Sequence, residues 1–169
     1  MKVIIINGAA RTGKDTFVEM VAAESSTEVI NLSTIDPVKN AMKRLGWDGV
    51  TKNDETRQMM ADLKQLWISH MNGPFNYIVK TINDIMLVQD GVDVNFFVHC
   101  REPEEIAKLK QHYKYDGISL LIKRDGLHVP KNGADDVVEN FVYDHLVDNS
   151  GSLELLKFYA REFIDKWIL

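Results

Sequence analysis

Residues 7–17 of the chain, NGAARTGKDTF, decide how the rest of the sequence is interpreted. Gly8 and Gly13 stand five positions apart and Lys14 follows, which is the G-x-x-x-x-G-K spacing of a phosphate-binding loop. Asp15 stands where the usual pattern has Ser or Thr. The stretch therefore predicts a phosphate-binding loop with an unusual carboxylate.

The flanking residues supply the structural context that such a loop requires. Val3 to Ile6 are consecutive β-branched residues, a pattern typical of a strand buried on both faces in a parallel sheet. After the loop, Phe17, Val18 and Val21 recur with helical spacing. A strand, a glycine-containing loop and a helix thus follow one another at the start of the chain.

Composition narrows the class of protein. The chain has 169 residues, of which 45% are hydrophobic and 27% charged, as in an ordinary globular protein. This length predicts a single domain spanning residues 1–169. The formal net charge of −5 argues against a general nucleic-acid binder, because such proteins usually carry a basic excess.

Targeting and redox signals are few. The only cysteine is Cys100, so no internal disulfide forms, which fits a cytoplasmic protein. The apolar run from Val3 to Ile6 is too short for a signal peptide. No stretch approaches the ~20 apolar residues of a membrane span. We therefore expect a cytoplasmic protein without a membrane partner.

The remaining apolar patterns alternate between strand and helix. Short strands are predicted near residues 29–33, 94–100, 118–122 and 144–148, and helices near residues 36–45, 54–71, 78–86, 103–112 and 152–167. Strands that alternate with helices predict an α/β, three-layer fold with a five-stranded parallel sheet flanked by helices. Within it, Asp36 is expected to cap the helix that Pro37 starts.

Two segments have candidate roles beyond the sheet. The polar stretch between Lys123 and Tyr143 is too long for a simple connection, so residues 123–142 or so form either a lid or a disordered segment. The helical region of about residues 33–75 follows the second strand. We expect the acceptor of a transferred group to bind there.

The loop chemistry is that of polyphosphate binding. Backbone N–H groups of the loop and the dipole of the following helix attract phosphate oxygens, and Lys14 adds a mobile positive charge. The alternative is an ordinary strand-to-helix turn with incidental glycines. The candidate nucleotide-binding residues are Gly8, Ala9, Ala10, Arg11, Thr12, Gly13, Lys14, Asp15 and Thr16.

Asp15 has three interpretations. Its carboxylate, like the Thr16 hydroxyl, is a suitable oxygen ligand for Mg²⁺. It could instead orient the group that receives the phosphoryl. It could also simply stabilise the first helical turn as a favourable charge. Asp15 and Thr16 are therefore the candidate metal ligands, and Lys14 and Asp15 are candidate catalytic residues.

GAARTGKDTF resembles the loop of bacteriophage-type deoxynucleoside monophosphate kinases and of related small-molecule kinases. LSTIDPVKNAM, FFVHCREPEEIAKLK and YDHLVDNSGSLELL are also similar to segments of those enzymes. The resemblance implies a P-loop kinase fold, ATP as phosphate donor, Mg²⁺, and a nucleoside monophosphate as acceptor. It also implies that the turn containing Asn149 and Gly151 passes near the adenine.

One departure from this family concerns the metal. The third predicted strand ends in His99, Cys100 and Arg101, so the carboxylate expected after that strand is missing. Support for Mg²⁺ would then rest more heavily on Asp15 and Thr16. With a single cysteine and no histidine cluster, a zinc site is not expected.

Phosphoryl transfer also needs further cations and acceptor contacts. Arg101 follows a strand at the edge where open sheets bind ligands, and Arg124 opens the expected lid. Both are candidate catalytic residues, although Arg101 could instead pair with Glu105 four residues on. The candidate acceptor-binding residues are Asp36, Lys39, Arg57 and Arg101; ordinary exposed helix charges are the alternative for Lys39 and Arg57.

The sequence thus predicts ATP- and Mg²⁺-dependent phosphoryl transfer to a small phosphorylated acceptor, a (deoxy)nucleoside monophosphate by resemblance. One alternative is a phosphomevalonate-like or dephospho-coenzyme-A-like kinase. Another is a nucleotide-binding protein without catalysis. The expected partner is the small acceptor molecule, not a nucleic acid, and the chain is expected to be a monomer or a homodimer.

Overall fold

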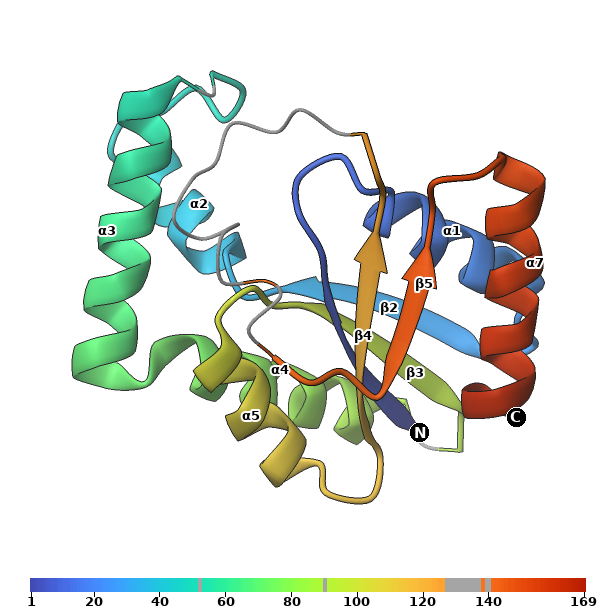
Figure 1. Ribbon diagram of the computed structural model, residues 1–169. Helices are drawn as coiled ribbons and strands as arrows, with labels where there is room; N and C mark the ends of the chain where they lie inside the picture. The colour runs from blue at the N-terminus through green and yellow to red at the C-terminus, as the bar shows by residue number, and fades with distance from the viewer. Residues whose placement is uncertain (52, 90, 127–137, 139–140) are drawn as a thin grey trace. The chain divides into compact units, whose positions relative to one another are not determined.

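The computed structural model describes residues 1–51, 53–89, 91–126, 138 and 141–169 (Figure 1). Two compact units divide the chain: Met1–Asn31 together with Gln89–Leu169, and Leu32–Val88. Whether they fold as one domain, as the length predicts, stays a prediction. The first unit contains β1 (Lys2–Asn7), α1 (Lys14–Glu24), most of β2 (Glu28–Ser33), β3 (Val94–His99), α5 (Pro103–His112), β4 (Gly117–Lys123), β5 (His145–Asp148), α7 (Leu153–Phe163) and a terminal π-helix (Ile164–Ile168).

The five strands form one sheet in the order β2-β3-β1-β4-β5. β1 lies between β3 and β4 and pairs in parallel with both, with Ile6 opposite His99 on one side and Leu120 on the other. β4 pairs in parallel with β5. The carboxyl ends of β1 and β3 are therefore neighbours at one edge of the sheet. The predicted five-stranded parallel α/β sheet is confirmed.

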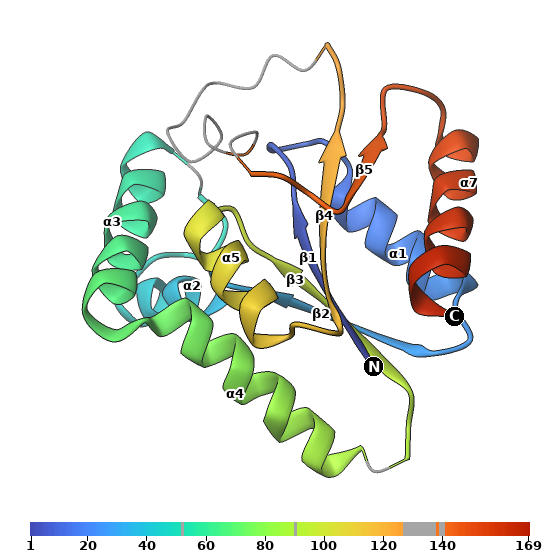
Figure 2. The same ribbon diagram turned by 60° about the horizontal axis from the view of Figure 1, so that its bottom comes forward.

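Helices cover both faces of this sheet (Figures 1 and 2). On one face, Phe17 of α1 and Phe163 of α7 meet edge to face at 5.7 Å between ring centroids, over Phe97 of β3. On the other face, α5 packs against β4 and β1 through the buried Ile106 and Leu109. The β1 residues Val3 to Ile6 are fully buried because helices lie on both sides, as their unbroken apolar pattern predicts.

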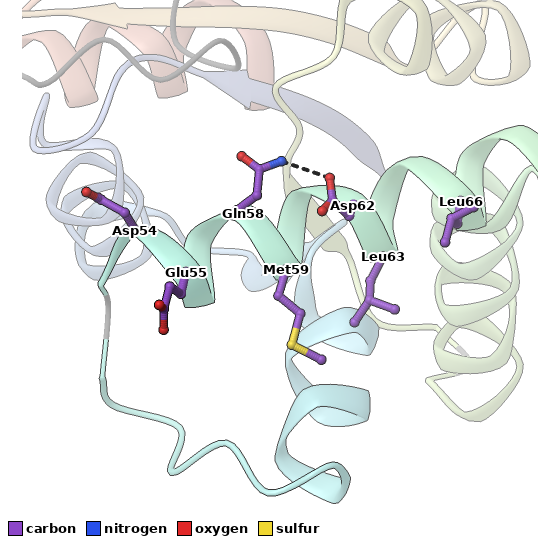
Figure 3. Close-up of a pocket in the computed structure, with 7 residues that line it drawn as sticks. All are labelled: Asp54, Glu55, Gln58, Met59, Asp62, Leu63 and Leu66. Carbon is purple, nitrogen blue, oxygen red and sulfur yellow. Dashed lines mark hydrogen bonds between the residues drawn. The ribbon is translucent and has the colours of Figure 1, made fainter.

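The second unit consists mainly of α2 (Asp36–Arg44), α3 (Asp54–Met71) and α4 (Gly73–Val88). α3 packs against both α2 and α4. The Trp67 indole lies directly over Gly73, where a Cβ atom would collide with its ring. Figure 3 shows side chains that line an exposed hollow along α3, among them the apolar Met59 and Leu63 and the acidic Asp54, Glu55 and Asp62.

Local details refine several expectations. Ile35, rather than Asp36, is the N-cap of α2, because Asp36 already lies within the first helical turn. Ser152 caps α7, and its hydroxyl accepts a hydrogen bond from the Leu155 amide at 3.3 Å. Most of the expected lid lies outside the described residues. Among the described residues, no helix is both long and apolar enough to cross a membrane.

Candidate functional site

The loop between β1 and α1 makes two backbone approaches that require glycine. Gly8 is buried and adopts a φ of +148°, and a Cβ atom there would collide with the Ile122 carbonyl of β4. Gly13 adopts a φ of +93°, and a Cβ atom there would collide with the Asn149 amide nitrogen. Both positions lie in the region of φ that favours glycine, so each glycine of the motif has a geometric reason.

Asn149 holds the loop from the far end of the chain. Its side-chain Nδ2 donates a hydrogen bond of 2.8 Å to the Thr12 carbonyl, and its backbone N–H donates one of 2.7 Å to the Lys123 carbonyl. The side chain is buried, so these bonds are shielded from water. Asn149, which resemblance places near the adenine, thus contacts the loop itself; the sequence alone did not indicate this contact.

Lys14, the first residue of α1, folds back over the loop. Its ammonium donates hydrogen bonds of 2.6 Å to the Gly8 carbonyl and 2.7 Å to the Ala9 carbonyl. Thr12 closes the same turn by donating its hydroxyl to the Ala9 carbonyl at 3.0 Å. The lysine charge is therefore held at the loop, beside the first N–H groups of α1, where an anion is favoured.

Asn7 anchors the beginning of the loop and was not predicted from the sequence. Its Oδ1 accepts a hydrogen bond of 2.8 Å from the Gly8 amide. Its Nδ2 donates to the Tyr143 hydroxyl at 2.7 Å and to the Arg101 carbonyl at 3.2 Å. Burial raises the pKa of Tyr143 to about 12, so this phenol stays neutral and donates in turn to the Val138 carbonyl.

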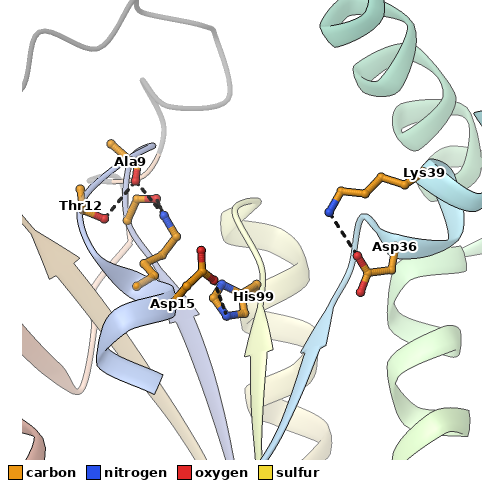
Figure 4. A network of polar contacts seen from close by, with 8 residues as sticks. Ala9, Thr12, Asp15, Asp36, Lys39 and His99 are labelled. Atoms are coloured by element: carbon orange, nitrogen blue, oxygen red, sulfur yellow. Dashed lines mark hydrogen bonds and ion pairs between the residues drawn. The ribbon is translucent and has the colours of Figure 1, made fainter. Parts of the chain in front are cut away.

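Asp15, the second residue of α1, faces His99 at the end of β3 (Figure 4). The distance from the His99 Nε2 to the Asp15 Oδ1 is 3.7 Å. The imidazole is 16% exposed, whereas the carboxylate is 83% exposed. A largely enclosed ring thus faces one oxygen of a carboxylate that remains accessible to a ligand.

The other candidates of the first unit lie in varied surroundings. Arg11 is exposed and adopts a left-handed φ of 65°, and Thr16 is half-buried in α1. Arg101 is half-buried just after β3, and Arg124 is exposed just after β4.

Glu105, the alternative partner for Arg101, accepts a hydrogen bond of 2.6 Å from Lys108. In the turn of Gly151, the Ser150 hydroxyl accepts a hydrogen bond of 2.8 Å from the Asp125 amide.

The acceptor-binding candidates Asp36, Lys39 and Arg57 all belong to the second unit. Lys39 donates a hydrogen bond of 3.3 Å to the Asp36 carboxylate, one turn back on α2 (Figure 4). Arg57 lies 3.6 Å from Asp54 on α3. Both pairs are solvent-accessible and of the i,i+3 type, so each contributes little to stability and leaves its cation available to a ligand.

The second unit also contains a buried cation that sequence reasoning missed. Lys64 of α3 is only 7% exposed, and its Nζ donates a hydrogen bond of 3.0 Å to the Thr34 hydroxyl. Thr34 is itself buried just after β2. The sequence pattern of α3 did not predict this burial, because a lysine between apolar positions normally extends to the surface.

The donor chemistry fits Mg²⁺ bound together with phosphates. Within the described part of the chain, no group of three or more His, Cys, Asp or Glu side chains gathers as a metal site. Mg²⁺ at phosphate sites needs only one or two protein oxygens, since phosphates and water complete its shell. The Asp15 carboxylate and the Thr16 hydroxyl, both beside the loop lysine, are of the type it takes.

The chain resembles known proteins in its structure rather than in its sequence. No family model matches the sequence, and no curated protein matches it. The structure resembles Mycobacterium tuberculosis APS kinase CysC with a Cys556Ala substitution, at 15% identity and a TM-score of 0.50, over 97% of this chain and 94% of that chain.

Two further solved structures are similar over almost their whole length. A shikimate kinase from Bacteroides thetaiotaomicron is 9% identical with a TM-score of 0.53, over 99% of each chain. A gluconokinase from Sinorhizobium meliloti 1021 is 12% identical with a TM-score of 0.50, over 98% of this chain and 92% of that chain. The chain therefore shares its fold with these three solved kinases. At these identities the likeness concerns the fold alone.

Proposed function

We propose that this protein transfers the γ-phosphoryl group of ATP to a small phosphorylated acceptor in an Mg²⁺-dependent reaction. The observation that carries the proposal is the loop, where Gly8 and Gly13 permit the close turns and the ammonium of Lys14 lies over the loop carbonyls. The fold, shared with small-molecule kinases, supports it.

In the proposed reaction, an acceptor oxygen attacks the γ-phosphorus. The bond from that phosphorus to the β,γ-bridging oxygen breaks, ADP leaves with the electron pair, and the acceptor oxygen loses its proton if it carried one. Catalysis of this kind is mostly positioning and charge neutralisation. We assign those tasks to the loop amides, Lys14, Arg11, Arg101 and Arg124, with Asp15 and Thr16 directed to Mg²⁺. Asn149 and Gly151 would border the nucleotide.

For the acceptor we propose a (deoxy)nucleoside monophosphate, bound by the second unit. Asp36, Lys39 and Arg57 supply one carboxylate and two cations there, which suits a molecule carrying both hydroxyl and phosphate groups. A phosphomevalonate-like or dephospho-coenzyme-A-like acceptor would use the same donor chemistry. A panel of these acceptors distinguishes the possibilities.

The test is ADP formation from ATP and Mg²⁺, measured with each acceptor in turn. We expect one class of acceptor to raise ADP production well above the acceptor-free background, and Lys14→Ala to abolish that increase. A second candidate function is nucleotide binding without catalysis, favoured by His99 at the strand end where a carboxylate is usual. It predicts that ATP binds while no acceptor raises ADP production.

A further inference from the structure

The pair formed by Asp15 and His99 joins two elements that the sheet fixes in place. His99 is the last residue of β3, and its register partner in β1 is Ile6, just before the loop. The Cys100 amide extends this pairing by donating to the Ile6 carbonyl at 3.2 Å. Asp15 is the second residue of α1. Neighbouring backbone segments thus bring the two side chains together, with the His99 Nε2 lying 3.7 Å from the Asp15 Oδ1.

These two residues occupy the positions that hold Mg²⁺ in most P-loop proteins. There, a Ser or Thr follows the loop lysine, and an acidic residue lies on the Walker-B strand. Here the residue after Lys14 is Asp15, and the strand next to β1 ends in His99. The carboxylate, that of Asp15, therefore lies on the loop side, and the imidazole of His99 lies at the end of the strand.

The chemistry of the two side chains assigns them different tasks. Mg²⁺ takes oxygen ligands, so the carboxylate of Asp15 suits it and the imidazole of His99 does not. A carboxylate accepts several contacts at once, and ligating carboxylates are commonly oriented by a donor behind them. His99 is enclosed and faces one oxygen, while the Asp15 side chain remains 83% exposed.

We propose that the carboxylate that binds Mg²⁺ in this protein is Asp15, on the loop side, and not a residue at the end of the strand. We further propose that His99 is the positioning residue that orients Asp15. His99 acts through Asp15 and does not contact the metal. This inference rests on the proposed function, because it assumes that a nucleotide and Mg²⁺ bind at the loop.

The test measures binding rather than turnover. Dissociation constants for a non-hydrolysable ATP analogue are determined by calorimetry, with Mg²⁺ and with EDTA. For the wild type we expect Mg²⁺ to tighten binding. Asp15→Asn, which alters the proposed ligand, and His99→Leu, which removes the outer-shell partner behind it, should each lose about tenfold or more of that enhancement. His99→Gln, which keeps a donor at the end of its side chain, should retain most of it.

Two combined variants make the test sharper. Because His99 acts through Asp15, the double variant Asp15→Asn with His99→Leu should be no weaker than Asp15→Asn alone. Asp15→Ser with His99→Asp restores the common arrangement and should recover the Mg²⁺ enhancement. Thermal unfolding of each variant checks folding. If His99→Leu does not fold, His99→Gln and the swapped variant decide.

The results that overturn the inference differ from those that overturn the proposed function. A folded His99→Leu or Asp15→Asn that keeps the full Mg²⁺ enhancement contradicts the positioning role. So does a folded swapped variant that stays as weak as Asp15→Asn, or a wild type that binds the analogue equally with and without Mg²⁺. A wild type that binds no nucleotide under either condition contradicts the proposed function itself.

Discussion

The side chain of Asn149 donates a hydrogen bond of 2.8 Å to the carbonyl of Thr12, across 137 positions of sequence. Gly13 follows Thr12, and a Cβ atom at Gly13 would collide with the same Asn149 amide. The conformation of the loop therefore depends on Asn149, which directly follows β5, as well as on the glycines of the loop itself.

Substitution of Gly13 tests this dependence. Gly13→Ala should cost about 1–2 kcal/mol for the left-handed backbone and about 1 kcal/mol more for the displaced hydrogen bond. The variant should also bind the ATP analogue more weakly. Gly91→Ala is the matched control, because Gly91 has a φ of +78° with open space where its Cβ would lie. Urea unfolding compares the two; equal losses would contradict the collision.

Removal of the loop lysine tests the phosphate site. Lys14→Ala removes the ammonium group and its two hydrogen bonds to the loop carbonyls. We expect affinity for the ATP analogue to fall at least about tenfold, or about 1.4 kcal/mol, with the fold retained. Lys114→Ala, an exposed lysine stacked on Tyr115, is the control. Full affinity and activity in Lys14→Ala would contradict the proposed mechanism.

The buried contact between Lys64 and Thr34 predicts an asymmetry. Thr34→Val removes the hydroxyl and leaves the buried ammonium with one hydrogen bond fewer, which should cost about 1–3 kcal/mol. Lys64→Met removes the charge itself and should cost less, since a buried cation can often be replaced by an apolar side chain. Unfolding in urea measures both.

Thr51→Val serves as the control for that pair, because the Thr51 hydroxyl bonds to Asp48 at an exposed site of the same unit. Its cost should stay below that of Thr34→Val. If Lys64→Met destabilises the protein more than Thr34→Val, the predicted asymmetry between the two substitutions is wrong.

His145 should make stability depend on pH near neutrality. It packs against Phe163 and Trp167, and burial together with the charge of Lys166 lowers its pKa below 6.5, against the opposite effect of Glu162. The folded state therefore disfavours the protonated ring. Its contribution to stability is complete above pH 6.5 and is lost as the pH falls through the lowered pKa.

The measurement is the free energy of unfolding of the wild type and of His145→Gln between pH 5 and pH 8. The difference between the two proteins should grow in favour of the wild type as the pH rises through this window, and should level off above pH 6.5. A constant difference would show that His145 titrates alike in the folded and unfolded chains.

Local patterns were sufficient to predict the fold. The apolar run of β1, the spacing of Gly8 and Gly13 and the periodicity of α1 are signals between neighbours in sequence, and the sheet and its helices follow from repeating them. The expected cap at Asp36 was wrong because the helix includes that residue and begins after Ile35.

The contacts that shape the site were beyond sequence reasoning, because they depend on which strands become neighbours. Asn7 meets Tyr143 across 136 positions, and Asp15 faces His99 only because β3 pairs with β1. The burial of Lys64 likewise follows from how α3 packs, which its own amphipathic pattern does not specify. The candidate loop residues were predicted from spacing, but the side chains that brace them were not.

The bond from Asn149 to Thr12 also has a consequence for biosynthesis. A ribosome makes the loop more than 130 residues before it makes this brace. The nascent chain must therefore wait for β5 before the loop acquires its final shape. The ATP site that we propose would then form only in the finished protein, so shorter nascent chains would gain no stability from ATP.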